Sequence, residues 1–499
     1  MSIGTLLIRA DANVRIGAGH VMRCLALAQA WQDAGGNAVF ATAELIPAIN
    51  TKLTAENCEV VQVSGEIGSE NDCKYTQDVA RQHSAQWIVL DGYQFDSKYQ
   101  EQVKMGGFKL LLVDDIGRKG IHLADVILNQ NLHATELIYS KRQPGSICLL
   151  GPRFSLLRRE FRNARGEPRE TSKRGTRVLV TMGGTDPENV TERVVGAISS
   201  VALESLEVIV VLGPGNPHLD VSARSPETCE INVVRDPKAL VELMRWADVA
   251  VSAAGSTVWE LCGCGVPTIL ISTAENQIPG AEELARRGVC VYLGVTQNIL
   301  WSHLVQGLRD LLVSKERRES MSQDGRALVD EQGATRVVNA LRGFNMTLRR
   351  VTRQDSMLLW RWANDPETRA ASFQSQPIAK AEHSRWLDTK LNSPNAAIYV
   401  AEDSSGAAIG HFRVEWSRAD DAEISISIAP DKRGSGIACT LIKKATEMAA
   451  RDAGLRQFHA YIKPENCASI RAFEKAGFSG FERAARGIHC CMRTELTNE

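Results

Sequence analysis

Short apolar runs alternate with longer amphipathic stretches along the first 160 residues. Helical patterns such as Val21–Ala34 lie between several of the apolar runs. Strands that alternate with helices predict a parallel sheet covered by helices on both faces. The predicted strands are Leu6–Arg9, Ala38–Ala41, Val60–Val63, Trp87–Leu90, Leu110–Val113, Val126–Leu128 and Ile147–Leu149.

A polar, basic stretch at Arg162–Arg177 has the composition of a linker, and after it the alternation restarts. Helices are predicted at Ala239–Trp246 and Val258–Cys264, and a helical stretch at Ser314–Leu341 closes this block. Ligands of such sheets bind at the carboxyl ends of strands, so two successive α/β domains predict a cleft between them. The predicted strands are Arg177–Met182, Val208–Leu212, Asn232–Val234, Val249–Val251 and Thr268–Ile271.

The pattern changes again after Gly343. Consecutive strands without intervening helices predict an antiparallel meander and therefore an α+β domain. We expect three domains, at residues 1–160, 161–344 and 345–499. The predicted strands of the last are Thr347–Val351, Ala397–Glu402, Ala408–Glu415, Ala422–Ile428 and Phe458–Ile462, and its helices are Met357–Asn364, Lys380–Leu391, Gly436–Ala450 and Ala468–Gly477.

Composition is that of a soluble globular protein, with 44% hydrophobic and 23% charged residues among 499. Fifty-eight basic and 59 acidic residues nearly balance, which gives no reason to expect nucleic acid or a membrane as partner. The first residues lack the pattern of a signal peptide, and no run is long enough to span a bilayer. We therefore expect a cytoplasmic protein. Its 12 cysteines lack the spacing of zinc sites or disulfide frameworks and are interpreted as buried thiols.

The segment Ile16–Cys24, I-G-A-G-H-V-M-R-C, joins the first strand to the first helix. Gly17 and Gly19 predict a turn of backbone N–H groups aimed at an anion, with a helix N-terminus behind it. His20 stands where a phosphate or a sugar would lie, and a titratable group there indicates chemistry as well as binding. The alternative is a structural histidine.

Two further glycine turns follow strands of the second block. Gly183-Gly184 precede Asp186, the predicted N-cap of a helix, and Pro187, its predicted first residue. In the other turn, Gly255 and Ser256 open a helix whose Glu260 lies one turn further along and could accept hydrogen bonds from a ribose. The alternative is that these glycines only permit tight turns. Neither turn is a Walker A loop, and Gly17-x-Gly19 lacks the third glycine of a dinucleotide fingerprint, so NAD and ATP are not expected.

These motifs, with D-G-Y at 91–93 and A-E-N-Q at 274–277, resemble a bacterial UDP-sugar hydrolase family over roughly residues 4 to 340. That family acts on UDP-2,4-diacetamido-2,4,6-trideoxy-altropyranose in pseudaminic acid biosynthesis and is similar in fold to the GT-B glycosyltransferases. The resemblance implies a GT-B-like pair of doubly wound α/β domains with His20 as the catalytic residue. It places Tyr93 and Asn276 in the active site. It assigns the UDP to Gly255, Ser256, Glu260 and Gln277.

The residues themselves are consistent with His20 as a base. Hydrolysis at an anomeric carbon needs a base for water, and a neutral imidazole serves at cellular pH. A helix N-terminus would keep it neutral. Asp11 is a candidate to orient His20 or the sugar, and Asp114-Asp115 is interpreted as structural or substrate-orienting. No cluster demands a metal, so none is expected.

In the last domain, the segment 431–438 fits R-x-x-G-x-A, in which backbone N–H groups cradle a pyrophosphate. With Asn466-x-x-Ser469 and A-G-F at 476–478, it resembles the GNAT acetyltransferases over about 347 to 493. The segments 360–369 and 382–386 are similar to the branch that acetylates amino sugars. The resemblance implies acetyl-CoA as cosubstrate, bound by Ile428, Arg433, Gly434, Ser435, Gly436, Ile437, Ala438, Asn466, Ser469 and Phe473.

Phe473 departs from the family, in which many members have a tyrosine that protonates the leaving sulfur. A thiol of pKa about 8.5 still leaves tolerably as thiolate. Glu423 is the candidate base for the substrate ammonium, with a surface strand residue as the alternative, and His411 is a weaker candidate.

The sequence thus predicts a bifunctional enzyme that acetylates a UDP-amino sugar and then hydrolyses the product to free sugar and UDP. One alternative is a GT-B glycosyltransferase that passes the sugar to an acceptor. Another is a non-catalytic nucleotide-sugar sensor. The stereochemistry of the sugar, the coupling of the sites and the oligomeric state stay open.

Overall fold

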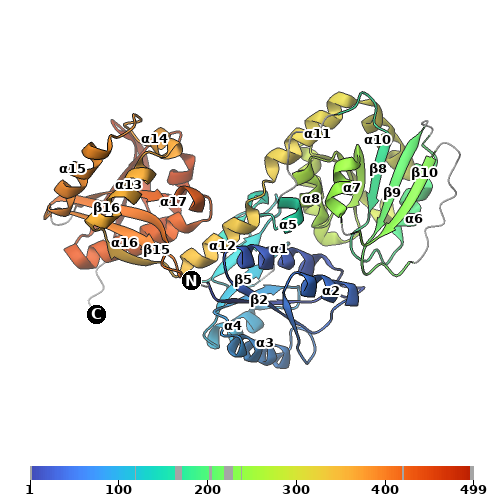
Figure 1. The fold of residues 1–499 in the computed structure, drawn as a ribbon, viewed down its shortest axis with the longest axis horizontal. Helices are drawn as coiled ribbons and strands as arrows, with labels where there is room; N and C mark the ends of the chain where they lie inside the picture. Colours follow the sequence, from blue (N-terminus) through green and yellow to red (C-terminus); the bar gives the residue numbers. More distant parts are fainter. Residues whose placement is uncertain are drawn as a thin grey trace. The chain divides into compact units, whose positions relative to one another are not determined.

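The computed structural model describes residues 3–117, 120–162, 171–201, 205–218, 229–237, 239–418 and 421–494. Two compact units divide the chain, one up to Val337 and the other from Val338 onward (Figure 1). The predicted domain limits stay a proposal. Residues 163–170 of the predicted linker lie outside the described residues.

The first unit begins with a seven-stranded sheet in which all neighbours run parallel, in the order β3-β2-β1-β4-β5-β6-β7. Strand β1 lies between β2 and β4, so the winding reverses there, and crevices for ligands form at such reversals. All seven predicted strands are confirmed. The strands are β1 (Thr5–Ala10), β2 (Asn37–Thr42), β3 (Glu59–Gln62), β4 (Trp87–Asp91), β5 (Lys109–Val113), β6 (Val126–Asn129) and β7 (Ile147–Leu150), and the helices are α1 (Gly19–Asp33), α2 (Pro47–Ala55), α3 (Glu70–Gln82), α4 (Ser97–Met105) and α5 (Arg159–Arg162).

Alternate residues of this sheet pack against helices on its two faces. Leu7, Val39 and Leu90 share a buried cluster with residues of α3 and α4, whereas α1 contacts β1 and β2 on the opposite side. These strands read as continuous apolar runs because both faces are buried.

A second parallel sheet follows, in the order β10-β9-β8-β11-β12-β13, and its winding reverses between β8 and β11. Helices α6 and α10 pack on one face, and α7, α8 and α9 on the other (Figure 1). The sequence missed β13. The elements are β8 (Arg177–Thr181), β9 (Leu206–Leu212), β10 (Cys229–Arg235), β11 (Val249–Ala253), β12 (Thr268–Ser272), β13 (Cys290–Val295), α6 (Val190–Ile198), α7 (Leu240–Trp246), α8 (Thr257–Cys264), α9 (Ile278–Arg286), α10 (Trp301–Val313), α11 (Lys315–Leu328) and α12 (Gly333–Phe344).

The second unit is a seven-stranded, mostly antiparallel sheet in the order β14-β15-β16-β17-β18-β20-β19, in which only β17 and β18 run parallel. Helices α16 and α17 pack on one face, and α13 and α15 on the other. The sequence missed α14, β19 and β20. The elements are β14 (Thr347–Arg350), β15 (Ala396–Glu402), β16 (Ala408–Arg418), β17 (Asp421–Ile428), β18 (Gln457–Ile462), β19 (Ser479–Ala484), β20 (Gly487–Arg493), α13 (Ser356–Ala363), α14 (Pro366–Ala371), α15 (Lys380–Leu391), α16 (Ile437–Ala453) and α17 (Cys467–Ala476).

The expected fold class, a GT-B-like pair of doubly wound α/β domains followed by an α+β domain of GNAT type, is confirmed by these three sheets. No disulfide joins any of the 12 cysteines, all of which lie within the described ranges, and eight of them are buried. Within the described ranges, no helix is long and apolar enough to cross a bilayer.

Candidate active sites

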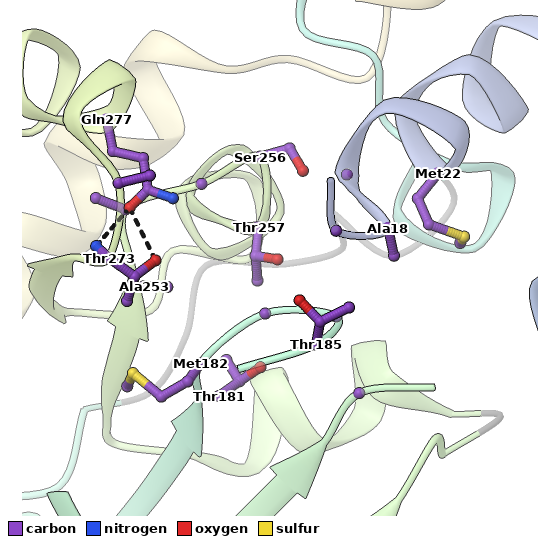
Figure 2. Close-up of a pocket in the computed structure, with 18 of the residues that line it drawn as sticks. Ala18, Met22, Thr181, Met182, Thr185, Ala253, Ser256, Thr257, Thr273 and Gln277 are labelled. Atoms are coloured by element: carbon purple, nitrogen blue, oxygen red, sulfur yellow. Dashed lines mark hydrogen bonds between the residues drawn. The ribbon is translucent and has the colours of Figure 1, made fainter. Parts of the chain in front are cut away.

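A cavity of about 600 Å³ lies in the first unit, where the carboxyl ends of the two parallel sheets meet. Its size falls in the range of small-molecule sites. All three glycine turns predicted from the sequence line it, together with His20 and Glu260. In Figure 2, Ala18 and Met22 of α1 lie across from Thr185 and Ser256 of the second sheet's turns.

Two helix N-termini face each other across this cavity. Neither the N-cap of α1, Ala18, nor that of α8, Ser256, caps its helix with a side-chain hydrogen bond. A methyl group added at Gly19 would lie 3.6 Å from Oγ of Ser256, so the two ends are in close approach. Unsatisfied N–H groups and the helix dipoles favour an anion between them.

The turn at Gly183-Gly184 differs from its prediction. Helix α6 begins at Val190, not at Pro187. Asp186 nevertheless satisfies this helix end, because its carboxylate accepts hydrogen bonds from the backbone N–H of Val190 at 2.8 Å and of Thr191 at 2.9 Å. The N-terminus of α6 therefore already holds an anion of the protein itself, whereas the N-caps of α1 and α8 provide no side-chain hydrogen bond.

His20 is held by a buried carboxylate. Its Nδ1 donates a hydrogen bond of 2.6 Å to Oδ1 of Asp91, which is the last residue of β4 and fully buried. The strand register explains the pairing: Asp91 lies beside Ala10 at the end of β1, from which the chain turns into His20. Among the described residues, no side chain bonds Nε2 of His20. The ring is 8% exposed and lines the cavity, so Nε2 is the nitrogen left for a ligand.

Arg23, one turn further along α1, ties two carboxylates together. Its guanidinium donates to Asp91 at 2.6 Å through both Nε and Nη2, and to Oδ1 of Asp115 at 2.7 Å through Nη1. Burial alone would raise the pKa of Asp91, but the charge of Arg23 and the hydrogen bonds from Arg23 and His20 outweigh it and hold that pKa far below its ordinary value. The pKa of Asp115 is also lowered, because Arg23 outweighs its burial.

Tyr93 and Asn276 continue the network from opposite sides of the cavity. The Tyr93 hydroxyl donates to Oδ2 of Asp115 at 3.1 Å and accepts a hydrogen bond of 2.7 Å from Nδ2 of Asn276. The Tyr93 ring meets the His20 ring edge-on, with centroids 5.2 Å apart. Burial and the negative charge of Asp115 raise the pKa of Tyr93, so its hydroxyl keeps its proton. The structure thus brings the three residues expected in this active site together.

Glu260 lies in α8, one turn after Ser256, as predicted, and both residues line the cavity. Its carboxylate accepts hydrogen bonds from Arg158 at 3.0 and 3.2 Å. Burial raises the pKa of Glu260, although Arg158 opposes that shift. Gln277 lies near Gly255, and its Oε1 accepts a hydrogen bond from the backbone N–H of Thr273 (Figure 2). Its Nε2 is oriented toward Gly255, 3.8 Å from where a methyl group there would lie.

Asp11 does not take the position expected of it. Its carboxylate pairs with the buried Arg9 at 2.6 Å and accepts hydrogen bonds from the backbone of Ala43 and Glu44. Asp11 does not line the cavity, and its carboxylate is occupied by Arg9 and this backbone instead of by His20. Asp114 is structural, since it accepts hydrogen bonds from Tyr139 and the backbone of Gly117, whereas its neighbour Asp115 belongs to the network around Arg23.

The sequence analysis named Asp115, with Asp114, as structural or substrate-orienting, but it did not single out Asp91 and Arg23, although each stands in a motif that it did quote. Asp91 opens D-G-Y, and Arg23 lies within I-G-A-G-H-V-M-R-C. The available signal was their charge, because an ionised residue inside an apolar strand or helix needs a buried partner.

In the second unit, the turn before α16 matches the expected anion cradle. Gly434 and Gly436 have φ of +75° and +79°, a conformation that glycine adopts without strain. Gly436 is the N-cap of α16, a 17-residue helix whose first two residues are Ile437 and Ala438. Ser435 is buried and donates a hydrogen bond to the carbonyl of Lys432. Arg433 instead binds Asp365 and Glu367 at 2.6 Å each, beside α14.

The other residues expected at acetyl-CoA have visible structural roles. Asn466 is the N-cap of α17, and its Oδ1 accepts a hydrogen bond from the backbone N–H of Ser469 at 3.1 Å. Phe473 is 4% exposed and meets Phe478 edge-to-face with ring centroids 4.9 Å apart. The ring is thus part of the hydrophobic core of this unit.

Strands β17 and β18 part along their length. Their pairing covers three residues, from Asp421 opposite Gln457 to Glu423 opposite His459, although β17 continues to Ile428. Glu423 is exposed, and its carboxylate lies 3.4 Å from Nη1 of Arg486. The parted strands offer backbone groups to a ligand that runs from the turn at Gly434 along β17.

His411 lies on β16 under α13. Its ring stacks on Trp362 with centroids 6.2 Å apart, and its Nδ1 is a buried atom without a hydrogen-bond partner. Burial, with Arg413 and His383 nearby, lowers the pKa of His411 to about 4. So low a pKa makes it a poor proton acceptor at neutral pH.

Across the described ranges, no group of three or more His, Cys, Asp or Glu residues has the geometry of a metal site.

Comparison with known proteins finds two family models that match along the chain. Residues 177–336 match the model of the glycosyltransferase family 28 C-terminal domain, and residues 345–479 match that of the acetyltransferase (GNAT) domain. An uncharacterized protein of Methanocaldococcus jannaschii is 23% identical over 491 residues, 95% of this chain and 96% of that protein. The likeness to it extends across both units.

Two relatives match one unit each. A UDP-2,4-diacetamido-2,4,6-trideoxy-beta-L-altropyranose hydrolase of Campylobacter jejuni is 23% identical over 286 residues, 57% of this chain and 97% of that protein. A putative phosphinothricin acetyltransferase of Bacillus subtilis is 31% identical over 117 residues, 22% of this chain and 70% of that protein.

Proposed function

The chain belongs to the GNAT acetyltransferases through its C-terminal domain, which is fused to a unit similar to the UDP-sugar hydrolases of pseudaminic acid biosynthesis, and from this combination we propose that it carries out two consecutive steps on one UDP-amino sugar. The GNAT domain transfers acetyl from acetyl-CoA to the 4-amino group of the sugar. The first unit then hydrolyses the UDP-2,4-diacetamido-2,4,6-trideoxy-altropyranose to free sugar and UDP. Fusion of consecutive steps releases the intermediate from the same molecule that uses it next.

The observation that carries the hydrolysis is the His20–Asp91 pair at the wall of the cavity. With Nδ1–H donated to Asp91, a neutral His20 presents the lone pair of Nε2 to a water. The water oxygen then bonds to the anomeric carbon and its proton goes to Nε2. The bond from that carbon to the diphosphate breaks, and the electron pair stays on UDP. As His20 gains the proton, the ionised Asp91 stabilises the imidazolium.

The surroundings of the cavity are suited to the leaving group. The diphosphate would lie between the N-termini of α1 and α8, where N–H groups of both helices lack a capping side chain. Glu260, held by Arg158, would accept hydrogen bonds from the ribose hydroxyls, and Gln277 would contact the uracil side of the site. Tyr93 and Asn276, linked by a hydrogen bond across the cavity, would enclose the sugar.

Acetyl transfer is supported by the turn at 433–438 and by the parting of β17 and β18. Acetyl-CoA would place its pyrophosphate at the N-terminus of α16 and its thioester beside the point where the strands separate. From Ile428 back to Glu423 is five residues of strand, about 17 Å, which an extended pantetheine arm can follow. Glu423 is the candidate base there, with Arg486 beside it.

The test is to incubate the full chain with the UDP-4-amino sugar, with and without acetyl-CoA, and to follow free CoA thiol and UDP. We expect acetylation first, then UDP release that His20→Ala abolishes while acetylation continues. Asp91→Asn keeps the imidazole of His20 but removes the carboxylate that orients it, and should lower the UDP release rate about 10³-fold. His303→Ala, an exposed histidine of α10 outside the cavity, is the matched control.

UDP release at the normal rate by His20→Ala would exclude this histidine as the base. UDP release only after addition of a second acceptor would support the glycosyltransferase alternative. Binding of the sugar nucleotide without any turnover would support a sensor.

A further inference from the structure

The second unit carries two histidines that the proposed reactions leave unused. His459 lies on β18 opposite Cys491, and His489 lies on β20 opposite Tyr461, two residue pairs further along the antiparallel register. Both side chains lie on the sheet face opposite the core beneath α16 and α17, because the residues that flank them along their strands are buried in that core: Phe458, Ala460 and Cys490.

His459 stands at the point where β17 and β18 part. It is opposite Glu423 in the last residue pair that the two strands share. Glu423 points to the same face, since its neighbours Ala422 and Ile424 are buried in the opposite core. A thioester brought to that point along β17 would therefore have Glu423 on one side and His459 on the other.

The two imidazoles form a continuous hydrogen-bonded pair. Nδ1 of His459 lies 2.8 Å from Nε2 of His489, and the ring planes are within 13° of each other with centroids 5.1 Å apart. A carboxylate stands at each end: Oδ1 of Asp421 is 3.0 Å from Nε2 of His459, and Oε1 of Glu482 is 3.5 Å from Nδ1 of His489.

This arrangement takes up one proton and only one. Two neutral imidazoles carry two N–H protons, of which one lies between the rings. A third proton makes a single cation and keeps the ring-to-ring bond, whereas a fourth would set two N–H groups against each other. The Glu482 side chain is 74% exposed, so this end of the pair reaches solvent.

The other groups on this face set the charge around the pair. Arg486 lies between Glu423, at 3.4 Å, and the ring of Tyr461, at 5.3 Å from its centroid. Cys491 is opposite His459 on β20. Glu423 is thus already beside a cation, and the histidine pair is a second candidate proton acceptor at the parting strands.

We propose that His459 and His489 form the proton-transfer pair of the acetyltransferase: a proton from the amine at the parting of β17 and β18 reaches the buried Nε2 of His459 through the exposed carboxylate of Asp421 and leaves beside Glu482. The inference rests on the acetyl transfer proposed above. The amine nitrogen bonds to the thioester carbonyl carbon, and the carbon–sulfur bond breaks with its electron pair on sulfur. The ammonium loses two protons: one passes through His459 and His489 to solvent, and the other ends on the thiolate.

The experiment measures acetyl-CoA-dependent acetylation of the UDP-4-amino sugar by the full chain between about pH 7 and about pH 9.5. The variants are His459→Gln and His489→Gln, which keep a hydrogen-bonding side chain without a titrating group. We expect kcat near pH 7 to fall about 10²-fold in each, with KM for acetyl-CoA unchanged. The loss should disappear toward pH 9.5, because an amine of pKa about 8 is then already deprotonated.

Cys491→Ser, on the same face of the same strand, is the control and should keep the parent pH profile. A loss of equal size at every pH in the histidine variants would mean that the pair only supports the fold, and an unchanged profile would also overturn the proposal. If the parent enzyme acetylated no amine at any pH, the acetyltransferase function itself would fail, which is a distinguishable result.

Discussion

The buried Arg23 belongs to a network of charged residues that holds two side chains of the proposed active site. Arg23 costs free energy to bury and is retained with two carboxylates around it, Asp91 and Asp115. Removing one partner would leave an uncompensated charge in the interior. Asp91 orients the ring of His20, and Asp115 orients that of Tyr93. The network therefore costs stability but holds two rings of the proposed active site in place.

His411 predicts a pH dependence of stability in the second unit. Its pKa in the folded protein is about 4, below the 6.5 of a free imidazole. Between these values the unfolded chain binds a proton that the folded chain does not, so stability falls as the pH drops from 6.5 toward 4. The free energy of unfolding should fall by up to about 3 kcal/mol more in the parent protein than in His411→Phe, which stacks on Trp362 without titrating.

Urea unfolding of the full chain at about pH 7 and about pH 4.5, followed by tryptophan fluorescence, checks this difference. A gap between parent and His411→Phe that is the same at both pH values would contradict the burial of an uncharged ring.

At the scale of elements, the glycine turns allow the two halves of the first unit to approach each other. A methyl group at Gly184 would lie 2.5 Å from Cβ of Ala18, closer than two carbon atoms can come without movement. Ala18 is the N-cap of α1, and Gly184 follows β8 in the other half. The narrowness of the cavity therefore depends on position 184 being a glycine, which has no side chain.

Gly184→Ala should widen the cleft and separate its helix N-termini. We expect kcat/KM for UDP release to fall about 10²-fold, because a displacement near 1 Å misaligns the reacting groups, while acetylation in the second unit is unchanged. Gly196→Ala in α6 is the matched control, because its added methyl group would meet nothing within 4 Å. This substitution also replaces a glycine inside a helix, which favours the helix. Equal kcat/KM values in the two variants would exclude the close approach as a determinant of activity.

For the whole molecule, two compact units with separate cores predict separate unfolding. The cores of the first unit contain residues from its two parallel sheets, and those of the second contain residues from β14 onward. Ligand sites of the two proposed reactions lie within different units. Each ligand should therefore stabilise one unit and not the other.

Differential scanning calorimetry of the full chain should show two transitions. UDP at 100 times its Kd adds about 2.7 kcal/mol to the unit that binds it, and CoA does the same for the other. We expect UDP to raise one midpoint and CoA the other. A single transition that both ligands shift would show that the units unfold together.

The strands and most helices followed from the sequence because their signals are local: apolar runs bounded by turns, and apolar residues at helical spacing. Elements with weaker local signals were missed, such as β19 and β20 at the polar end of the chain. The start of α6 was misplaced because Asp186 caps its helix from four residues away instead of from its N-cap position. The sequence identified Asp186 as the residue that caps α6, but it placed Asp186 at the N-cap position, which Asn189 occupies.

The sequence by itself determined the order of elements, the three glycine turns and the residue types at their ends. The tertiary structure decided which of these meet: Asp91 reaches His20 because β1 and β4 are neighbours in a sheet although 71 residues separate the pair, and Asp11, close in sequence, is turned toward Arg9. Likewise, His459 and His489 become partners only when β20 lies against β18. Local patterns encode secondary structure, whereas strand order and register, set by packing of the whole core, decide which charged groups share a site.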